Sequence, residues 1–431
     1  MGDKKAEDGS HLDIYMDKYE LYQNGDVTTY YQGFQSLETQ HRYEKINSAL
    51  KKGYLYKIME QLPNVDFFDF SEENKELLRK LVCGITSEVG RALVGVTFLQ
   101  LTIKSIAPDQ SIRLHKGTTR RGSFSWVDGI SMRTIDSMYS TPFLREQGLL
   151  NVNKFGVFMT RSLAENYPYS KLYKAEMRGP FSEWIDIVDA IENGSMPALS
   201  GLYYLMALLK NKSDAFHAMA DKAVELAVHY KGRSFHGVTM LMNSFFHNTE
   251  YSARAFEVVI HGFMQAMWES DMLGGLELVP MSQMRSANKK HGNIGDVELK
   301  DGNVIVESWD AKYGKPYLRD ELEELRDKIS ISLGTKAAGF IVDGAVDRRE
   351  EITNRIKEIS METGVDIELL SFEEWIAYQT KGITEAQLDN LAGKWLDAVV
   401  ESFAQKRPYM APIDEPCEEW LKDLVKFMKK Y

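Results

Sequence analysis

Residues 295–315 constrain the fold of this chain more than any other stretch. Two runs that resemble β-strands flank the dipeptide Asp301-Gly302, which is typical of a tight β-hairpin turn. The first run opens on Asp296, and the second, Val304–Lys312, ends in Asp310-Ala311-Lys312. The pattern therefore predicts a hairpin that carries acids on both strands and a lysine at the end of the second.

The segments around this hairpin predict a compact α/β unit. Apolar residues at helical spacing (Phe256, Val259, Ile260, Phe263 and Met267) predict a helix before it, and residues 276–281 predict a short strand. A helix then starts near Pro316, with Leu318, Leu322, Leu325 and Ile329 as its buried stripe, and residues 338–343 predict a buried strand. The order is helix, three strands, helix, strand, followed by helix 348–360, strand 366–370 and helix 372–378.

This order, together with an acid, a hairpin and acid-x-lysine, resembles the PD-(D/E)XK nuclease superfamily over residues 252–378. The resemblance implies an α/β (α+β) fold with a mixed central sheet flanked by helices. It implies that Asp296 and Asp310 hold a divalent metal, Mg²⁺, and that Lys312 serves the attacking water and the scissile phosphate. The carbonyl of Ala311 is the candidate third ligand, because hard oxygen atoms suit Mg²⁺. Gly295 stands where proline is usual in the superfamily.

The alternation of side chains along a strand tests this hypothesis. Asp310 and Lys312 share one face of their strand, and Glu307 points to the other. A strict two-residue Asp301-Gly302 turn would place Asp296 opposite Glu307, facing away from Asp310. A three-residue loop, a bulge, or a position of Asp296 ahead of its strand would correct the parity. Without such a correction, Glu307 competes for the metal.

Glu257 is a further candidate acid. It lies on the helix before the strands, where some members of the superfamily supply an additional carboxylate. The alternative is an ordinary glutamate on the flank of an amphipathic helix.

Composition excludes several classes of protein. A net charge of −11 argues against a protein that coats nucleic acid through a globally basic surface. The two cysteines, Cys83 and Cys417, give neither a disulfide framework nor zinc spacing. There is no Walker A loop, so we expect no ATP, and no apolar run reaches the roughly 20 residues of a membrane span. The first residues lack the apolar core of a signal peptide, so we expect a cytoplasmic protein.

Three basic stretches are candidate DNA contacts, because cations and short polar side chains bind phosphates and base edges. They lie within residues 104–121, 145–180 and 281–295, and Lys315 follows the motif. The alternative for each is a solvated loop or an ordinary helix. The candidate DNA-binding residues are Arg113, Lys116, Arg120, Arg121, Arg161, Gln283, Arg285, Lys289, Lys290 and Lys315.

These expectations divide the chain into four parts. Residues 1–12 form a disordered tail, 13–245 a mainly helical DNA-recognition region, 246–382 the catalytic domain, and 383–431 helices for packing or dimerisation. The resemblance implies a type II restriction endonuclease that cuts double-stranded DNA, and a homodimer is the simplest way to cut both strands. The alternatives are a modification-dependent or defence-system nuclease, and a DNA-binding protein with an inactive nuclease-like domain.

Overall fold

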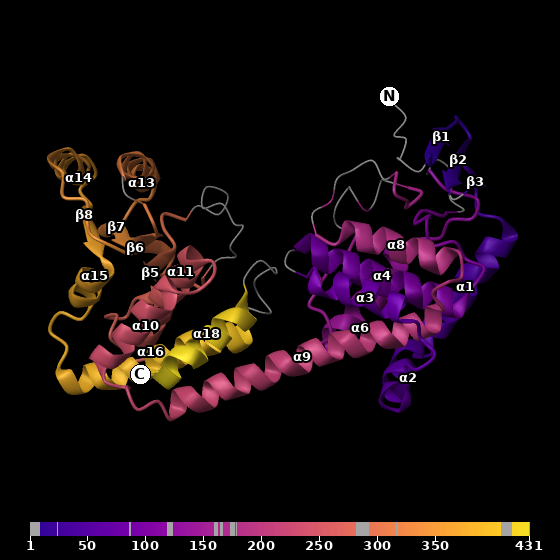
Figure 1. Cartoon of the computed structure of the whole chain (residues 1–431). Coiled ribbons are helices and arrows are strands. Elements are labelled where there is room, and N and C mark those ends of the chain that lie inside the picture. The colour runs from indigo at the N-terminus through magenta and orange to yellow at the C-terminus, as the bar shows by residue number, and fades with distance from the viewer. Residues whose placement is uncertain are drawn as a thin grey trace. The chain divides into compact units, whose positions relative to one another are not determined.

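The chain forms two compact units, 1–215 and 216–431, in the computed structural model (Figure 1). The structure describes residues 9–23, 25–85, 88–118, 124–158, 163, 167–172, 177, 179–281, 293–315, 318–406 and 416–430. The boundary falls inside one long helix, α9 (Ala198–Val228), so unit 2 begins ahead of residue 246, where the sequence analysis began the catalytic domain.

Unit 1 combines a helical body with a small sheet. Its antiparallel strands are β1 (His11–Ile14), β2 (Lys18–Gln23) and β3 (Asp26–Tyr31). Its helices are α1 (Leu37–Lys51), α2 (Tyr54–Gln61), η1 (Leu62–Asn64), α3 (Glu72–Cys83), α4 (Glu88–Ile106), α5 (Met132–Ile135), η2 (Asp136–Ser140), α6 (Thr141–Glu146), α8 (Phe181–Glu192) and the first part of α9. The expected disordered tail to residue 12 was wrong at its end, because strand β1 begins at His11, whereas the region that follows is mainly helical as predicted.

Helix α4 is the centre of unit 1. It packs against α1, α3 and α8, and its middle is solidly apolar, with Leu93, Phe98 and Leu101 fully buried. Within the described residues, one segment, Val89–Ile106 in α4, is long and apolar enough to cross a membrane, and 72% of it is buried. That burial is what the core helix of a globular unit requires.

Unit 2 is built on a mixed five-stranded sheet in the order β4-β5-β6-β7-β8. Strands β4 (Glu277–Leu278), β5 (Val297–Asp301) and β6 (Val304–Lys312) are antiparallel, whereas β7 (Ala337–Val342) and β8 (Asp366–Ser371) run parallel to β6. The helices are α10 (Phe235–His247), α11 (Ser252–Trp268), α13 (Arg319–Ile331), α14 (Glu350–Thr363), α15 (Phe372–Gln379), α16 (Glu385–Glu401), η3 (Ser402–Lys406) and α18 (Cys417–Lys430). The predicted α+β class is confirmed, with helix, three strands, helix and strand in the predicted order.

The sheet separates two apolar cores. Alternation along β7 directs Ile341 to one core and Phe340 to the other. Helices α13 and α14 cover the Phe340 face, and α10, α11, α16 and α18 lie on the Ile341 side (Figure 1). The C-terminal helices therefore pack within unit 2, where the Trp395 indole donates to the Val259 carbonyl at 3.0 Å. This is the packing role that the sequence analysis allowed for them.

Candidate active site

The hairpin between β5 and β6 contains a bulge. Near the turn, Asp301 pairs with Val304 and Lys300 with Ile305, but beyond it Leu299 pairs with Glu307. Val306 is therefore the extra residue on β6. The predicted Asp301-Gly302 turn was wrong by one position: the connection is Gly302-Asn303, and Gly302 takes a φ of +57° that favours glycine.

The bulge decides which side chain Asp296 meets. Val297 pairs with Trp309, and the Asp296 backbone N–H donates to the Trp309 carbonyl at 2.9 Å, so Asp296 lies opposite Asp310. The register near the turn, continued without the bulge, would place Asp296 opposite Trp309. Asp296 also lies just ahead of β5. Two of the three corrections expected from the sequence are therefore present, and Asp296 and Asp310 share a face.

Three carboxylates gather at this point. The Asp296 carboxylate accepts a hydrogen bond from the Ala311 backbone N–H at 3.0 Å. Burial raises the pKa of Asp296 well above its ordinary value, and repulsion from Glu257 and Asp310, with a side-chain hydrogen bond to Asp310, raises it further. Asp296 therefore favours its protonated form in this arrangement.

Lys312 completes the motif on the same strand face. Its Nζ lies 3.0 Å from Asp310 Oδ2, with the two side chains 21% and 10% exposed. The amine also lies 5.8 Å from the centre of the Phe340 ring. Burial, the largest single effect, lowers the pKa of Lys312. The charge of Asp310 and its hydrogen bond, with the charges of Asp296 and Glu321, together outweigh burial, so the pKa is raised. Lys312 is therefore a fixed cation at neutral pH.

Glu257 reaches the cluster from α11. It forms an ion pair with Arg254, which lies one turn earlier on the same helix and is buried. A buried arginine needs a hydrogen-bonded counter-ion, and Glu257 supplies one. The charge of Glu257 also raises the pKa of Asp296. Glu257 therefore interacts both with the buried Arg254 and with the acidic pair.

Glu321 is a neighbour of the site that the sequence analysis missed. It lies in the first turn of α13, and its Oε1 is 3.4 Å from Nζ of Lys315. Its charge also raises the pKa of Lys312. The signal in the sequence was an acid at the start of the helix after the hairpin, but helix acids there are common because they favour the helix dipole.

Glu307 does not join the cluster. It accepts hydrogen bonds from the Trp309 indole at 2.5 Å and from the Gln379 amide at 2.7 Å, on the opposite face of β6 from Asp310. The competition for the metal that an uncorrected register would bring therefore does not arise.

The acidic pair suits a hard divalent cation. Asp296 and Asp310 offer carboxylate oxygens, and Ala311, whose carbonyl is the predicted third ligand, lies beside them in β6. A divalent cation here would compensate the negative charges that raise the pKa of Asp296. Within the described residues, no group of three His, Cys, Asp or Glu side chains is arranged to hold a metal. A metal here would take its remaining ligands from backbone, water and substrate, as Mg²⁺ commonly does.

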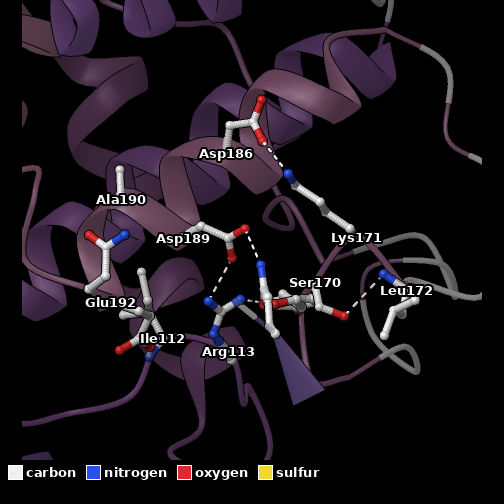
Figure 2. A network of polar contacts seen from close by, with 12 residues as sticks. Ile112, Arg113, Ser170, Lys171, Leu172, Asp186, Asp189, Ala190 and Glu192 are labelled. Carbon is white, nitrogen blue, oxygen red and sulfur yellow. Dashed lines mark hydrogen bonds and ion pairs between the residues drawn. The ribbon is translucent and has the colours of Figure 1, made fainter. Parts of the chain in front are cut away.

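The predicted DNA contacts fall in different environments. Arg113 is buried, and its guanidinium donates to Asp189 on α8 at 2.6 Å and to the Tyr169 carbonyl at 2.5 Å (Figure 2). The Asp189 carboxylate compensates the charge of Arg113, so Arg113 could contact DNA only if this ion pair broke. Lys315 is 55% exposed beside Glu321. The predicted residues Arg120, Arg121, Arg161, Gln283, Arg285, Lys289 and Lys290 lie outside the described residues.

The chain matches no protein-family model, and no curated protein is significantly similar to it. The chemistry of the site is therefore inferred from its own residues.

Proposed function

We propose that this chain is a Mg²⁺-dependent endonuclease that hydrolyses phosphodiester bonds of double-stranded DNA, of the type II restriction kind. The observation that carries the proposal is the convergence of Asp296, Asp310 and Lys312 on one face of the hairpin, with Glu257 alongside. The element order of unit 2 supports the resemblance to the PD-(D/E)XK superfamily. The proposal includes a cytoplasmic protein that acts as a homodimer on its DNA.

The state of Lys312 limits its role. A lysine whose pKa is raised stays protonated at neutral pH, so it does not serve as a general base. Its ammonium group instead donates hydrogen bonds to the scissile phosphate and opposes the negative charge that develops there. Asp310 holds it in place at 3.0 Å.

The two aspartates are the proposed metal-binding residues. Asp296 and Asp310, with the Ala311 carbonyl, would hold Mg²⁺, and the Ala311 N–H fixes the Asp296 carboxylate at 3.0 Å. When bound, Mg²⁺ supplies a water of lowered pKa and neutralises charge on the phosphoryl oxygens. Glu257 is placed to orient a water or to complete the ligand set through one.

The test is incubation of plasmid or phage DNA with the protein and Mg²⁺, followed by sequencing of the fragment ends. Discrete fragments with constant end sequences support restriction, whereas a smear indicates a non-specific nuclease. Asp310→Ala and Lys312→Ala should lose nearly all cleavage and still bind DNA. Asp301→Asn is the matched control, because Asp301 is an exposed acid on the same hairpin outside the cluster. Full activity in Asp310→Ala would overturn the proposal.

The second candidate is a DNA-binding protein with an inactive nuclease-like domain. The ion pairs of Asp310 with Lys312 and of Glu257 with Arg254 favour it, because they compensate these charges without a metal. It predicts that no cleavage occurs at any Mg²⁺ concentration and that Asp310→Ala leaves DNA binding and processing unchanged.

A further inference from the structure

The basic loop of unit 1 has an ordered base. The Trp126 N–H donates to the Lys116 carbonyl at 3.2 Å, and the Thr118 N–H donates to Ser125 Oγ at 2.8 Å. Lys116 and Phe124 are brought near each other by these two bonds, and residues 119–123 between them lie outside the described residues.

Phe124 is supported by other rings. It stacks on Tyr167, with the ring centres 5.5 Å apart and the planes 18° from parallel. Trp126 lies edge-on to both rings, at 5.3 Å from each. Trp126 is fully buried, and Tyr19 packs edge-on against it at 4.9 Å. Phe124 itself is 41% exposed. It is therefore a ring fixed by its neighbours and still open to solvent.

Lys116 brings a charge to the same rings. Its Nζ lies 5.7 Å from the centre of the Phe124 ring and 5.9 Å from that of Tyr167. A cation at this distance is attracted to the ring faces and held near them. An exposed ring with a lysine beside it differs from an apolar docking surface for protein, whose centre is depleted of charge.

We propose that Phe124 and Lys116 form a platform for an unpaired DNA base, with the base stacked on Phe124 and its backbone phosphate at Lys116. Aromatic rings and cations together are how proteins bind single strands without reading sequence. Inside a duplex both faces of a base are covered, so a stacking ring requires a base that has left the stack. The platform rests on the proposed function and extends it, because it makes a displaced base part of the substrate.

The chain offers a matched control. Phe155 is 62% exposed, and Nζ of Lys154 lies 5.0 Å from the centre of its ring. In the described part of unit 1, no other aromatic ring packs against Phe155. Phe155 and Lys154 therefore reproduce the exposed ring and the nearby lysine of the platform, but without a second aromatic ring stacked on the first.

The experiment measures binding of the full chain, in EDTA, to a single-stranded oligonucleotide and to its fully paired duplex. Stacking contributes about 1–3 kcal/mol per base, so Phe124→Ala should weaken binding of the single strand about 5- to 150-fold. The duplex should lose less. Phe124→Trp should bind as the wild type does, and Phe124→Leu, which keeps apolar bulk, should bind weakly. Lys116→Ala should weaken both probes and lower the salt slope by about one.

Phe155→Ala should bind both probes as the wild type does. Equal affinities of Phe124→Ala and Phe155→Ala for the single strand would overturn the platform. If Phe124→Ala unfolds, the comparison of Phe124→Trp with Phe124→Leu decides the matter. Mg²⁺-dependent cleavage by the wild type tests the proposed function separately. Cleavage without a Phe124 effect removes the platform alone, a Phe124 effect without cleavage removes the nuclease alone, and a wild type that neither binds the single strand nor cleaves DNA overturns both.

Discussion

Asp296 and Asp310 face each other across the β5–β6 hairpin because one extra residue, Val306, shifts the register between them and the turn. Burial raises the pKa of Asp296 there, and the charges of Glu257 and Asp310 raise it further. The raised pKa is a property of the folded state, so the free energy of unfolding reports on this site without a substrate.

The first prediction concerns stability in the absence of metal. Because the pKa of Asp296 is raised in the fold, the folded state binds a proton that the unfolded chain, with a pKa of about 3.9, releases. The free energy of unfolding of unit 2 therefore falls as pH rises above that value. Asp296→Asn should flatten this dependence and raise stability at neutral pH by about 1 kcal/mol, the usual scale for relieving a strained site. Denaturant unfolding in EDTA at a series of pH values measures it.

The second prediction is that Mg²⁺ binding releases protons, because the raised pKa of Asp296 favours its protonated form and a bound cation favours the carboxylate. Calorimetric titrations in two buffers of different ionisation enthalpy give the number released. Asp301→Asn should behave as the wild type does, and Asp310→Asn should show neither binding nor release. Binding by the wild type with no proton release would contradict the raised pKa of Asp296.

The third prediction concerns Lys312. Lys312→Met removes the ammonium group near the scissile phosphate and should lower kcat about 10²- to 10³-fold, the scale of one lost electrostatic donor. DNA affinity should change little. Lys300→Met is the matched control, because Lys300 lies on β5 and pairs with Glu277 at 3.1 Å. The pH dependence of the single-turnover cleavage rate should have the same shape in the wild type and in Lys312→Met, since a fixed cation does not titrate in this range. A limb that disappears in Lys312→Met would indicate a general base instead.

The fourth prediction separates two roles for Glu257. If it orients the metal site, Glu257→Gln should weaken Mg²⁺ binding about 10- to 100-fold, as lost outer partners of metal ligands do. Glu269→Gln, at the other end of α11, should leave the affinity unchanged. Unchanged affinity in Glu257→Gln, with lowered thermal stability, would show that Glu257 serves only as the partner of the buried Arg254.

The order of elements in unit 2 was predictable because it depends on local patterns. Apolar periodicity places α11, β6 and α13, and acid-x-lysine sits at the end of an apolar strand. The bulge was not predictable as such, because Val306 is an ordinary strand residue and no glycine marks it. Strand parity alone indicated that the hairpin register needed a correction, and three kinds of correction were possible.

Features that depend on partners distant in the chain could not be predicted from the sequence. Arg113 fitted a basic loop, but its charge is taken up by Asp189, which lies 76 residues away. The small sheet of β1–β3 has short strands, and its Tyr19 packs against Trp126, far along the chain. Glu321 is recognised as a neighbour of the site only when the packing of α13 is known.

The last prediction concerns unit 1, where Asp136 at the start of η2 is buried and accepts hydrogen bonds from Thr141 Oγ1 at 2.8 Å and the Val157 N–H at 2.7 Å. Burial raises its pKa to about 6. Gly156 is needed beside it, because a Cβ there would lie 2.5 Å from the carboxylate.

Protonated Asp136 is favoured in the fold, so its contribution to the stability of unit 1 should be complete below about pH 4, fall by about 3 kcal/mol in total as pH rises through about 6, and level off above that. Asp136→Asn should remove this fall, although it loses one of the two acceptors and lowers stability near pH 4. Asp109→Asn, an exposed acid of the same unit, should keep the wild-type profile. Hydrogen exchange of unit 1 amides across pH 4–7, corrected for the intrinsic rate, measures it, and a wild-type profile that rises between pH 4 and 6 would show that Asp136 folds as the anion.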